Sequence, residues 1–90
     1  MKVIINVCYG NFGVSEEWAR RLGTIAYNTK KLRYNTELIE AIENGEDVNA
    51  SYSRLKVVEI PANCTDYEIE EYDGCESIAY VVDGKIYHIY

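Results

Sequence analysis

The chain lacks the long apolar segment that a membrane protein requires. Its longest apolar stretch, Val3 to Tyr9, is interrupted by Asn6 and is far shorter than the roughly 20 residues of a membrane-spanning helix. No small-residue cleavage site follows this stretch, so it does not fit a signal peptide. We therefore expect a cytoplasmic protein with no membrane partner.

Paired cysteines and clustered metal ligands are also missing. The chain has three cysteines, Cys8, Cys64 and Cys75, which are odd in number and widely spaced, so they predict neither a disulfide framework nor a Cys-x-x-Cys site. The single histidine, His88, has no cysteine or carboxylate at metal-ligand spacing. We expect reduced thiols, no metal and no cofactor.

Positive charge is scarce. Nine basic side chains stand against fifteen acidic ones, which gives a formal net charge of −6. This balance raises the electrostatic cost of approaching a phosphate backbone. Direct nucleic-acid binding is therefore disfavoured.

Apolar residues and tyrosines are plentiful. Ninety residues, 48% of them apolar, suit one domain over residues 1–90 with a single core. Nine tyrosines supply amphipathic contact area that suits interfaces as well as cores. Tyr90 lies on a predicted edge strand, where a second copy of the chain can pair, and this favours a homo-oligomer.

The first two thirds of the chain predict a strand, two helices and a strand. Residues 2–9 are apolar and β-branched enough for a strand covered on both faces, within which a buried Asn6 braces the following loop. Helices are expected from about 15 to 28, capped by Ser15, and from Asn35 or Thr36 to Gly45. The basic connector 28–34 is interpreted as a solvated loop, and the second strand ends before Pro61.

The last third predicts an antiparallel meander of strands near residues 67–72, 77–82 and 85–90. Asp83-Gly84 is typical of a two-residue hairpin turn, while Asp73-Gly74-Cys75 suggests a three-residue or bulged turn. The predicted fold is therefore α+β, in the order β-α-α-β-β-β-β. We expect a single mixed sheet with a parallel N-terminal crossover, an antiparallel C-terminal meander and helices on one face.

The loop between the first strand and the first helix is the leading candidate site. Glycines there let backbone amides approach an anion, and aromatic neighbours can stack on a ring. The loop has neither a Gly-x-Gly-x-x-Gly motif nor a P-loop lysine, so a simple tight turn is the competing interpretation. The predicted ligand-binding residues are Tyr9, Gly10, Asn11, Phe12, Gly13 and Ser15.

Cys8 offers a weaker catalytic alternative. Its spacing to Ser15 resembles the start of a phosphatase loop, but Val14 stands where an arginine would hold the oxyanion. Without that charge the thiol lacks activation, which favours a structural cysteine. A hydrolase that uses Cys8 with His88 is the third hypothesis, and a non-enzymatic protein is favoured over it.

The acidic, tyrosine-rich hairpin of residues 67–76 is the second candidate surface. Strand alternation sends Glu68 and Glu70 to one face and Tyr67 and Ile69 to the other. A solvated edge and a docking surface for a basic partner both fit this pattern. The predicted partner-binding residues are Glu68, Glu70, Glu71, Tyr72 and Asp73.

Three segments resemble a family of small, largely uncharacterised bacteriophage and prophage proteins that open with a strand and a Cys-Tyr-Gly-Gly-Phe-Gly loop. They are Asn6-x-Cys8-Tyr9-Gly10-x-Phe12-Gly13-Val14-Ser15, Val58-Glu59-Ile60-Pro61 and Tyr67-Glu68-Ile69-Glu70-Glu71-Tyr72-Asp73-Gly74. Asn11 replaces the second adjacent glycine. The resemblance implies a phage context, in which small proteins commonly bind and block host components such as defence systems.

Two functions follow as expectations. The first is a non-enzymatic binding protein that sequesters a small anionic or nucleotide-like ligand at the loop. The second is a protein–protein inhibitor that presents the acidic hairpin to a host protein.

Overall fold

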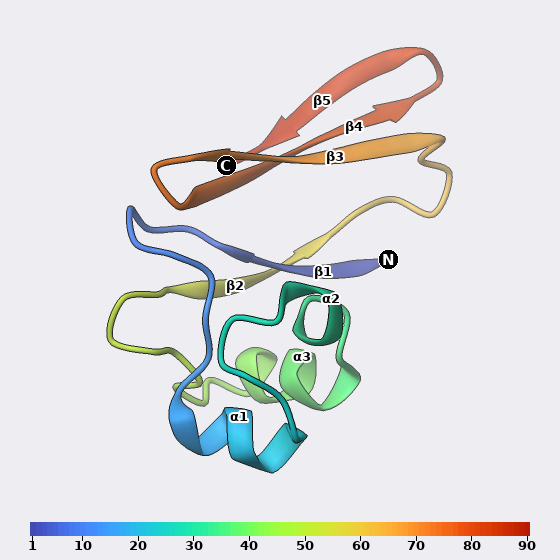
Figure 1. Ribbon diagram of the computed structural model, residues 1–90. Coiled ribbons are helices and arrows are strands. Elements are labelled where there is room, and N and C mark those ends of the chain that lie inside the picture. Colours follow the sequence, from blue (N-terminus) through green and yellow to red (C-terminus); the bar gives the residue numbers. More distant parts are fainter.

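The computed structural model describes residues 1–90 and divides the strands between two sheets. β1 (Lys2–Asn6) pairs antiparallel with β2 (Leu55–Glu59). β3 (Asp66–Tyr72), β4 (Cys75–Val82) and β5 (Lys85–Ile89) form a separate antiparallel sheet in that order. The fold is α+β, with the two-stranded sheet lying between the helices and the meander (Figure 1).

The predictions of one mixed sheet and of a parallel crossover were wrong. Residues 48–54 run back beside residues 7–15, so the chain enters β2 at the end where β1 finishes and Asn6 pairs with Leu55. The N–H of Val7 donates to the Arg54 carbonyl at 2.8 Å and the N–H of Ser15 to the Val48 carbonyl at 2.8 Å. This irregular antiparallel alignment determines the direction of β2.

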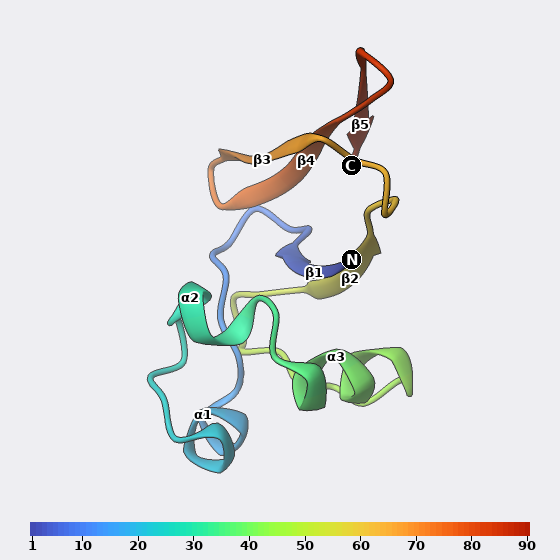
Figure 2. The same cartoon turned by 90° about the vertical axis from the view of Figure 1, so that its right-hand side faces the viewer.

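Three helices connect the two strands. α1 (Glu16–Leu22) is capped by Ser15 and ends at Gly23, whose φ of 68° is left-handed. α3 (Thr36–Glu43) is capped by Asn35, one of the two cap residues that the sequence allows. Figure 2 shows all three helices on the same side of the β1–β2 sheet.

α2 (Thr29–Leu32) corrects the interpretation of residues 28–34 as a solvated loop. Asn28 caps this short helix by accepting from the N–H of Lys31 at 3.3 Å. Leu32 is fully buried and Arg33 is nearly so. The two lysines of this segment are exposed, but Leu32 and Arg33 face inward.

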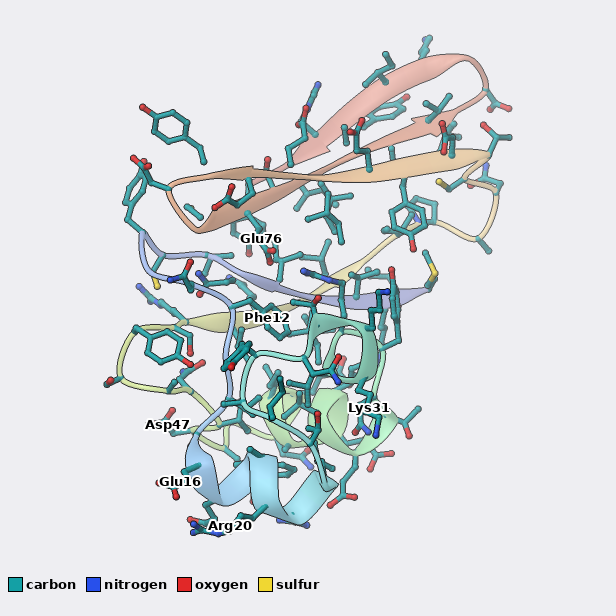
Figure 3. All side chains as sticks on the ribbon, in the orientation of Figure 1. Phe12, Glu16, Arg20, Lys31, Asp47 and Glu76 are labelled. Atoms are coloured by element: carbon teal, nitrogen blue, oxygen red, sulfur yellow. The ribbon has the colours of Figure 1, made fainter.

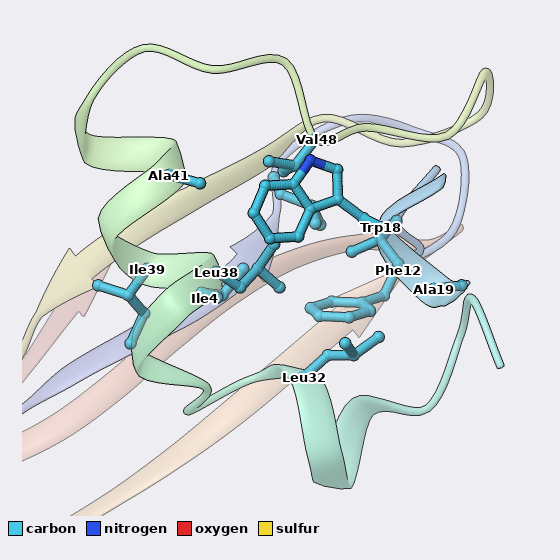
Figure 4. Packing of buried hydrophobic residues seen from close by; sticks show 11 residues of the cluster. Ile4, Phe12, Trp18, Ala19, Leu32, Leu38, Ile39, Ala41 and Val48 are labelled. Carbon is cyan, nitrogen blue, oxygen red and sulfur yellow. The ribbon is translucent and has the colours of Figure 1, made fainter. Parts of the chain in front are cut away.

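β1 is buried on both faces, as its near-continuous apolar sequence predicts. Ile4 faces the helices and joins a core with Phe12, Trp18, Leu32 and Leu38 (Figure 4). Val3 and Ile5 face the meander and pack with Val58, Ile60 and Ile78. A strand in a two-stranded sheet therefore has the burial of a central strand because other layers cover both of its faces.

The two hairpin turns of the meander are alike. Tyr72 pairs with Cys75 across Asp73-Gly74, and Val82 pairs with Lys85 across Asp83-Gly84. All four turn residues have positive φ, as a type I′ turn requires. The prediction of a three-residue or bulged turn at Asp73 was wrong.

Tyr34 and Tyr67 connect the helical layer to the meander through their hydroxyl groups, 2.5 Å apart. Burial, together with this hydrogen bond, raises the pKa of Tyr34 to about 12 from its ordinary 10.0. A raised pKa means that the folded chain favours the neutral phenol. Its contribution to stability is complete below pH 10 and is lost as the pH rises toward 12.

We therefore expect the free energy of unfolding to fall more steeply between about pH 10 and pH 12 in the unmodified chain than in a Tyr34→Phe variant. Urea unfolding at a series of pH values measures both slopes, and the variant carries the same lysines, so their titration cancels. Parallel slopes would contradict the prediction.

Candidate functional site

Residues 7–15, which we call the N-terminal loop, are anchored by the neighbouring segment 48–54. The N–H of Asn11 donates to the Tyr52 carbonyl at 3.2 Å and the N–H of Val14 to the Ala26 carbonyl at 2.8 Å. Ser53 Oγ donates to the Gly13 carbonyl at 2.6 Å. Several loop amides are therefore already bonded to carbonyls and do not face a ligand.

The glycines of the loop serve close packing. A Cβ at Gly10 would overlap the backbone carbonyl of Tyr52, and one at Gly13 would lie 2.6 Å from the Tyr52 hydroxyl oxygen. Neither glycine has a positive φ. The loop lies against segment 48–54 only because these positions have no side chain.

The N-terminal loop also contacts the β3–β4 turn. A Cβ at Gly74 would overlap the carbonyl oxygen of Gly10. Gly74 therefore seats the tip of the acidic hairpin against the middle of the loop. The two surfaces that the sequence predicts separately meet here.

The side chain of Asn6 forms hydrogen bonds to both the N-terminal loop and the β3–β4 turn. It therefore braces the loop, as its position in β1 predicts. Its side-chain amide nitrogen donates to the Gly74 carbonyl at 2.7 Å and to the Cys8 carbonyl at 3.1 Å. Its Oδ1 accepts from the N–H of Arg54 at 2.7 Å. The residue is fully buried, so one amide connects the loop, the hairpin and the segment before β2.

Arg33 and Glu76 form a buried ion pair beneath the junction. Both terminal nitrogens of the guanidinium donate to the carboxylate, at 3.0 and 2.9 Å, and the two side chains are only 10% and 9% exposed. Glu76 Oε1 also accepts from the N–H of Asn6 at 2.8 Å, and Arg33 donates to the Ile4 carbonyl at 2.8 Å. The pair therefore ties β1, the end of α2 and β4 together.

A pocket opens where the N-terminal loop meets the hairpin. Its volume is about 510 Å³, within the range of small-molecule sites. In Figure 3, Phe12 and Glu76 lie one above the other between the helices and the meander, far from Glu16 and Arg20 at the other end of the molecule. The lining residues are Asn11, Phe12, Tyr27, Tyr52, Glu71, Gly74 and Glu76.

The aromatic wall of the pocket comes from three segments. Phe12 is 7% exposed, and the guanidinium of Arg33 lies 4.8 Å from the centre of its ring. Tyr27 and Tyr52 are more open, at 64% and 41% exposed. The pocket thus combines one ring anchored in the core with two accessible phenols.

The predicted loop residues have different environments. Asn11 and Phe12 line the pocket, Gly10 and Gly13 belong to backbone contacts, and Tyr9 is 77% exposed. Ser15 caps α1 by accepting from the N–H of Trp18 at 3.3 Å and lines a neighbouring cavity of about 670 Å³.

The predicted hairpin residues divide between two faces. Glu71 faces the pocket, and its Oε1 accepts from the N–H of Gly74 at 2.6 Å. Glu68 and Glu70 alternate with the inward Tyr67 and Ile69, as the sequence predicts. Tyr72 is 74% exposed, and Asp73 is an exposed turn residue.

Sequence reasoning missed Arg33, Glu76, Tyr27 and Tyr52. Glu76 had a usable signal, because it is two residues before the buried Ile78 on the same strand and so shares its inward face. Arg33 follows Leu32 at the inward end of a single helical turn. The tyrosines come from irregular segments that carry no periodic signal.

Cys8 and His88 share no contact. The Cys8 thiol donates to Asn6 Oδ1 at 3.4 Å and to the Tyr52 carbonyl at 3.5 Å, while His88 lies 3.7 Å from Glu70 on the meander. No group of three or more His, Cys, Asp or Glu side chains is arranged to hold a metal ion. No helix has the length and apolarity to cross a membrane.

No protein-family model, curated protein sequence or solved structure matches this chain. The chemistry of the pocket is therefore the basis for assigning a function.

Proposed function

We propose that this chain is a non-enzymatic binding protein that holds a small, planar, nucleotide-like ligand in the pocket between the N-terminal loop and the β3–β4 turn. The observation that carries the proposal is the lining itself, which combines the aromatic rings of Phe12, Tyr27 and Tyr52 with the carboxylate of Glu71. A ring can stack on Tyr27 and Tyr52 while its N–H groups donate to Glu71. In the phage context suggested by the resemblance, capture of such a molecule would withdraw it from a host defence system.

The lining favours the base of a nucleotide over its phosphate. No lysine, arginine or histidine lines the pocket, and the guanidinium of Arg33, which contacts the lining residue Glu76, is already bonded to that carboxylate and to the Ile4 carbonyl. α1 begins outside the pocket and has only 7 residues. A phosphate would therefore extend into solvent at the open mouth, and the base would supply most of the affinity.

We expect guanosine, whose edge presents parallel N–H donors, to raise the melting temperature, because a ligand that binds only the folded state stabilises it. Guanosine monophosphate should bind no more than about threefold tighter than guanosine, because its phosphate lies in solvent, where salt screens its charge. Tyr27→Ala should weaken guanosine binding by about tenfold, which corresponds to the loss of one stacked base. Calorimetric titration measures these affinities.

Tyr90→Ala is the matched control, since Tyr90 is similarly exposed, at 61%, but does not line the pocket. It should leave guanosine affinity unchanged. The proposal fails if none of the common nucleosides binds, or if Tyr90→Ala and Tyr27→Ala weaken binding equally.

A protein–protein inhibitor is the second candidate, and the outer face of β3 favours it. Glu68 and Glu70 are exposed there on an edge strand, next to Tyr72. Of the two carboxylates, only Glu70 has a basic side chain nearby, with its Oε1 3.7 Å from His88 Nδ1. A basic host protein would find accessible carboxylates on this face, and its capture would be lost on Glu68→Lys while nucleoside binding in the pocket continued.

A further inference from the structure

Glu71 carries the one carboxylate of the pocket that no cation neutralises. Both oxygens of Glu76 accept from Arg33, and one also accepts from the N–H of Asn6. Glu71 Oε1 accepts from the N–H of Gly74, while Oε2 has no hydrogen bond and the side chain has no ion pair within the chain. A charged oxygen is therefore free to accept from a ligand.

The aromatic rings that line the same pocket reinforce the preference for positive charge. The faces of aromatic rings attract cations, and Phe12 already has a guanidinium over its ring. Tyr27 and Tyr52 stand at the same pocket with more than a third of their surface exposed. Rings and a free carboxylate together form the usual environment for an organic cation.

The pocket offers no comparable attraction to an anion. The N–H groups of Asn11 and Val14 in the loop donate to backbone carbonyls. The Gly74 amide donates to Glu71. The remaining donors of the lining, the Asn11 side-chain amide and the two phenols, are uncharged, so an anion would meet the Glu71 carboxylate without a compensating cation.

We propose that the pocket selects a planar organic cation, an amidinium or guanidinium group, whose paired N–H donors bind Glu71 and whose plane lies against Tyr27 and Tyr52. This inference rests on the proposed function of the same pocket, in which a planar group donates N–H bonds to Glu71, and adds that a positive charge on that group strengthens binding. The group belongs either to a free small molecule or to an arginine side chain of a partner protein.

Three probes of nearly equal shape test the charge preference. Benzamidinium is positive, benzamide is neutral and benzoate is negative. We expect benzamidinium to bind about tenfold tighter than benzamide, as a partly desolvated cation–carboxylate contact warrants. Benzoate should bind more weakly than benzamide.

Glu71→Gln should remove the preference, so that benzamidinium and benzamide bind with similar affinity. Glu17→Gln is the control, because Glu17 is an exposed carboxylate on α1 outside the pocket and its replacement makes the same change in net charge. It should retain the tenfold difference. N-acetyl-arginine amide represents an arginine side chain of a partner protein. If this probe binds more tightly than benzamidinium, the natural cation is such an arginine and not a free small molecule.

Equal binding of the three probes, or tighter binding of benzoate, would overturn the inference. So would a preference that survives Glu71→Gln. If guanosine binds but benzamidinium does not, the charge assignment fails while the binding pocket stands. If neither binds, both proposals fail.

Discussion

Replacing Glu76 by alanine is expected to lower the free energy of unfolding by about 3 to 5 kcal/mol, because it leaves the buried guanidinium of Arg33 without its charged partner. The N–H of Asn6 loses its acceptor in the same change. Urea unfolding at pH 7 measures the effect. Arg20→Ala is the control, since its ion pair with Glu16 is 70% and 86% exposed and exposed pairs contribute little.

The double variant Arg33→Met/Glu76→Leu distinguishes a buried ion pair from general crowding. When both partners become apolar, no unpaired charge remains in the interior. The double variant should therefore be less destabilised than the sum of Arg33→Met and Glu76→Leu. Additive losses would show that the two side chains do not interact in the folded protein.

Gly74→Ala is the second change with a large expected effect. The turn requires a φ of 83° at this position, and the added Cβ would also overlap the Gly10 carbonyl oxygen. Gly84 has a similar φ of 76° in the equivalent turn, but the space around it is open. Gly84→Ala therefore reports the backbone strain alone, about 1 to 2 kcal/mol.

We expect Gly74→Ala to lower the free energy of unfolding by at least about 1 kcal/mol more than Gly84→Ala, since the hairpin must move off the loop. The excess measures the loop–hairpin contact. Equal losses in the two variants would mean that the β3–β4 turn does not rest on the N-terminal loop. Gly74→Ala should also weaken guanosine binding, because Gly74 is part of the pocket lining.

The sequence predicted local features better than it predicted pairing. Caps at Ser15 and Asn35, the turn at Asp83-Gly84 and the burial of β1 on both faces follow from residue chemistry within a few positions. The direction of β2 depends on residues 48–54 lying beside the N-terminal loop, a contact between segments about forty residues apart. No local pattern encodes it.

The candidate site divides in the same way. Asn6 was identifiable because an amide inside an apolar strand must find partners. Arg33 looks like a surface charge when considered alone. The strand register places Glu76 on the inward face, but only its ion pair with Arg33, 43 positions away in the sequence, makes the burial of these charges favourable. Tyr27 and Tyr52 join the pocket for the same non-local reason.

The measurement that tests the account most directly is a map of backbone amide shifts during a guanosine titration of the ¹⁵N-labelled chain. A pocket shared by the N-terminal loop and the hairpin predicts that the largest shifts fall together on Asn11, Phe12, Tyr27, Tyr52 and residues 71–76. Shifts confined to the outer face around Glu68 and Glu70, with the loop amides unmoved, would contradict it.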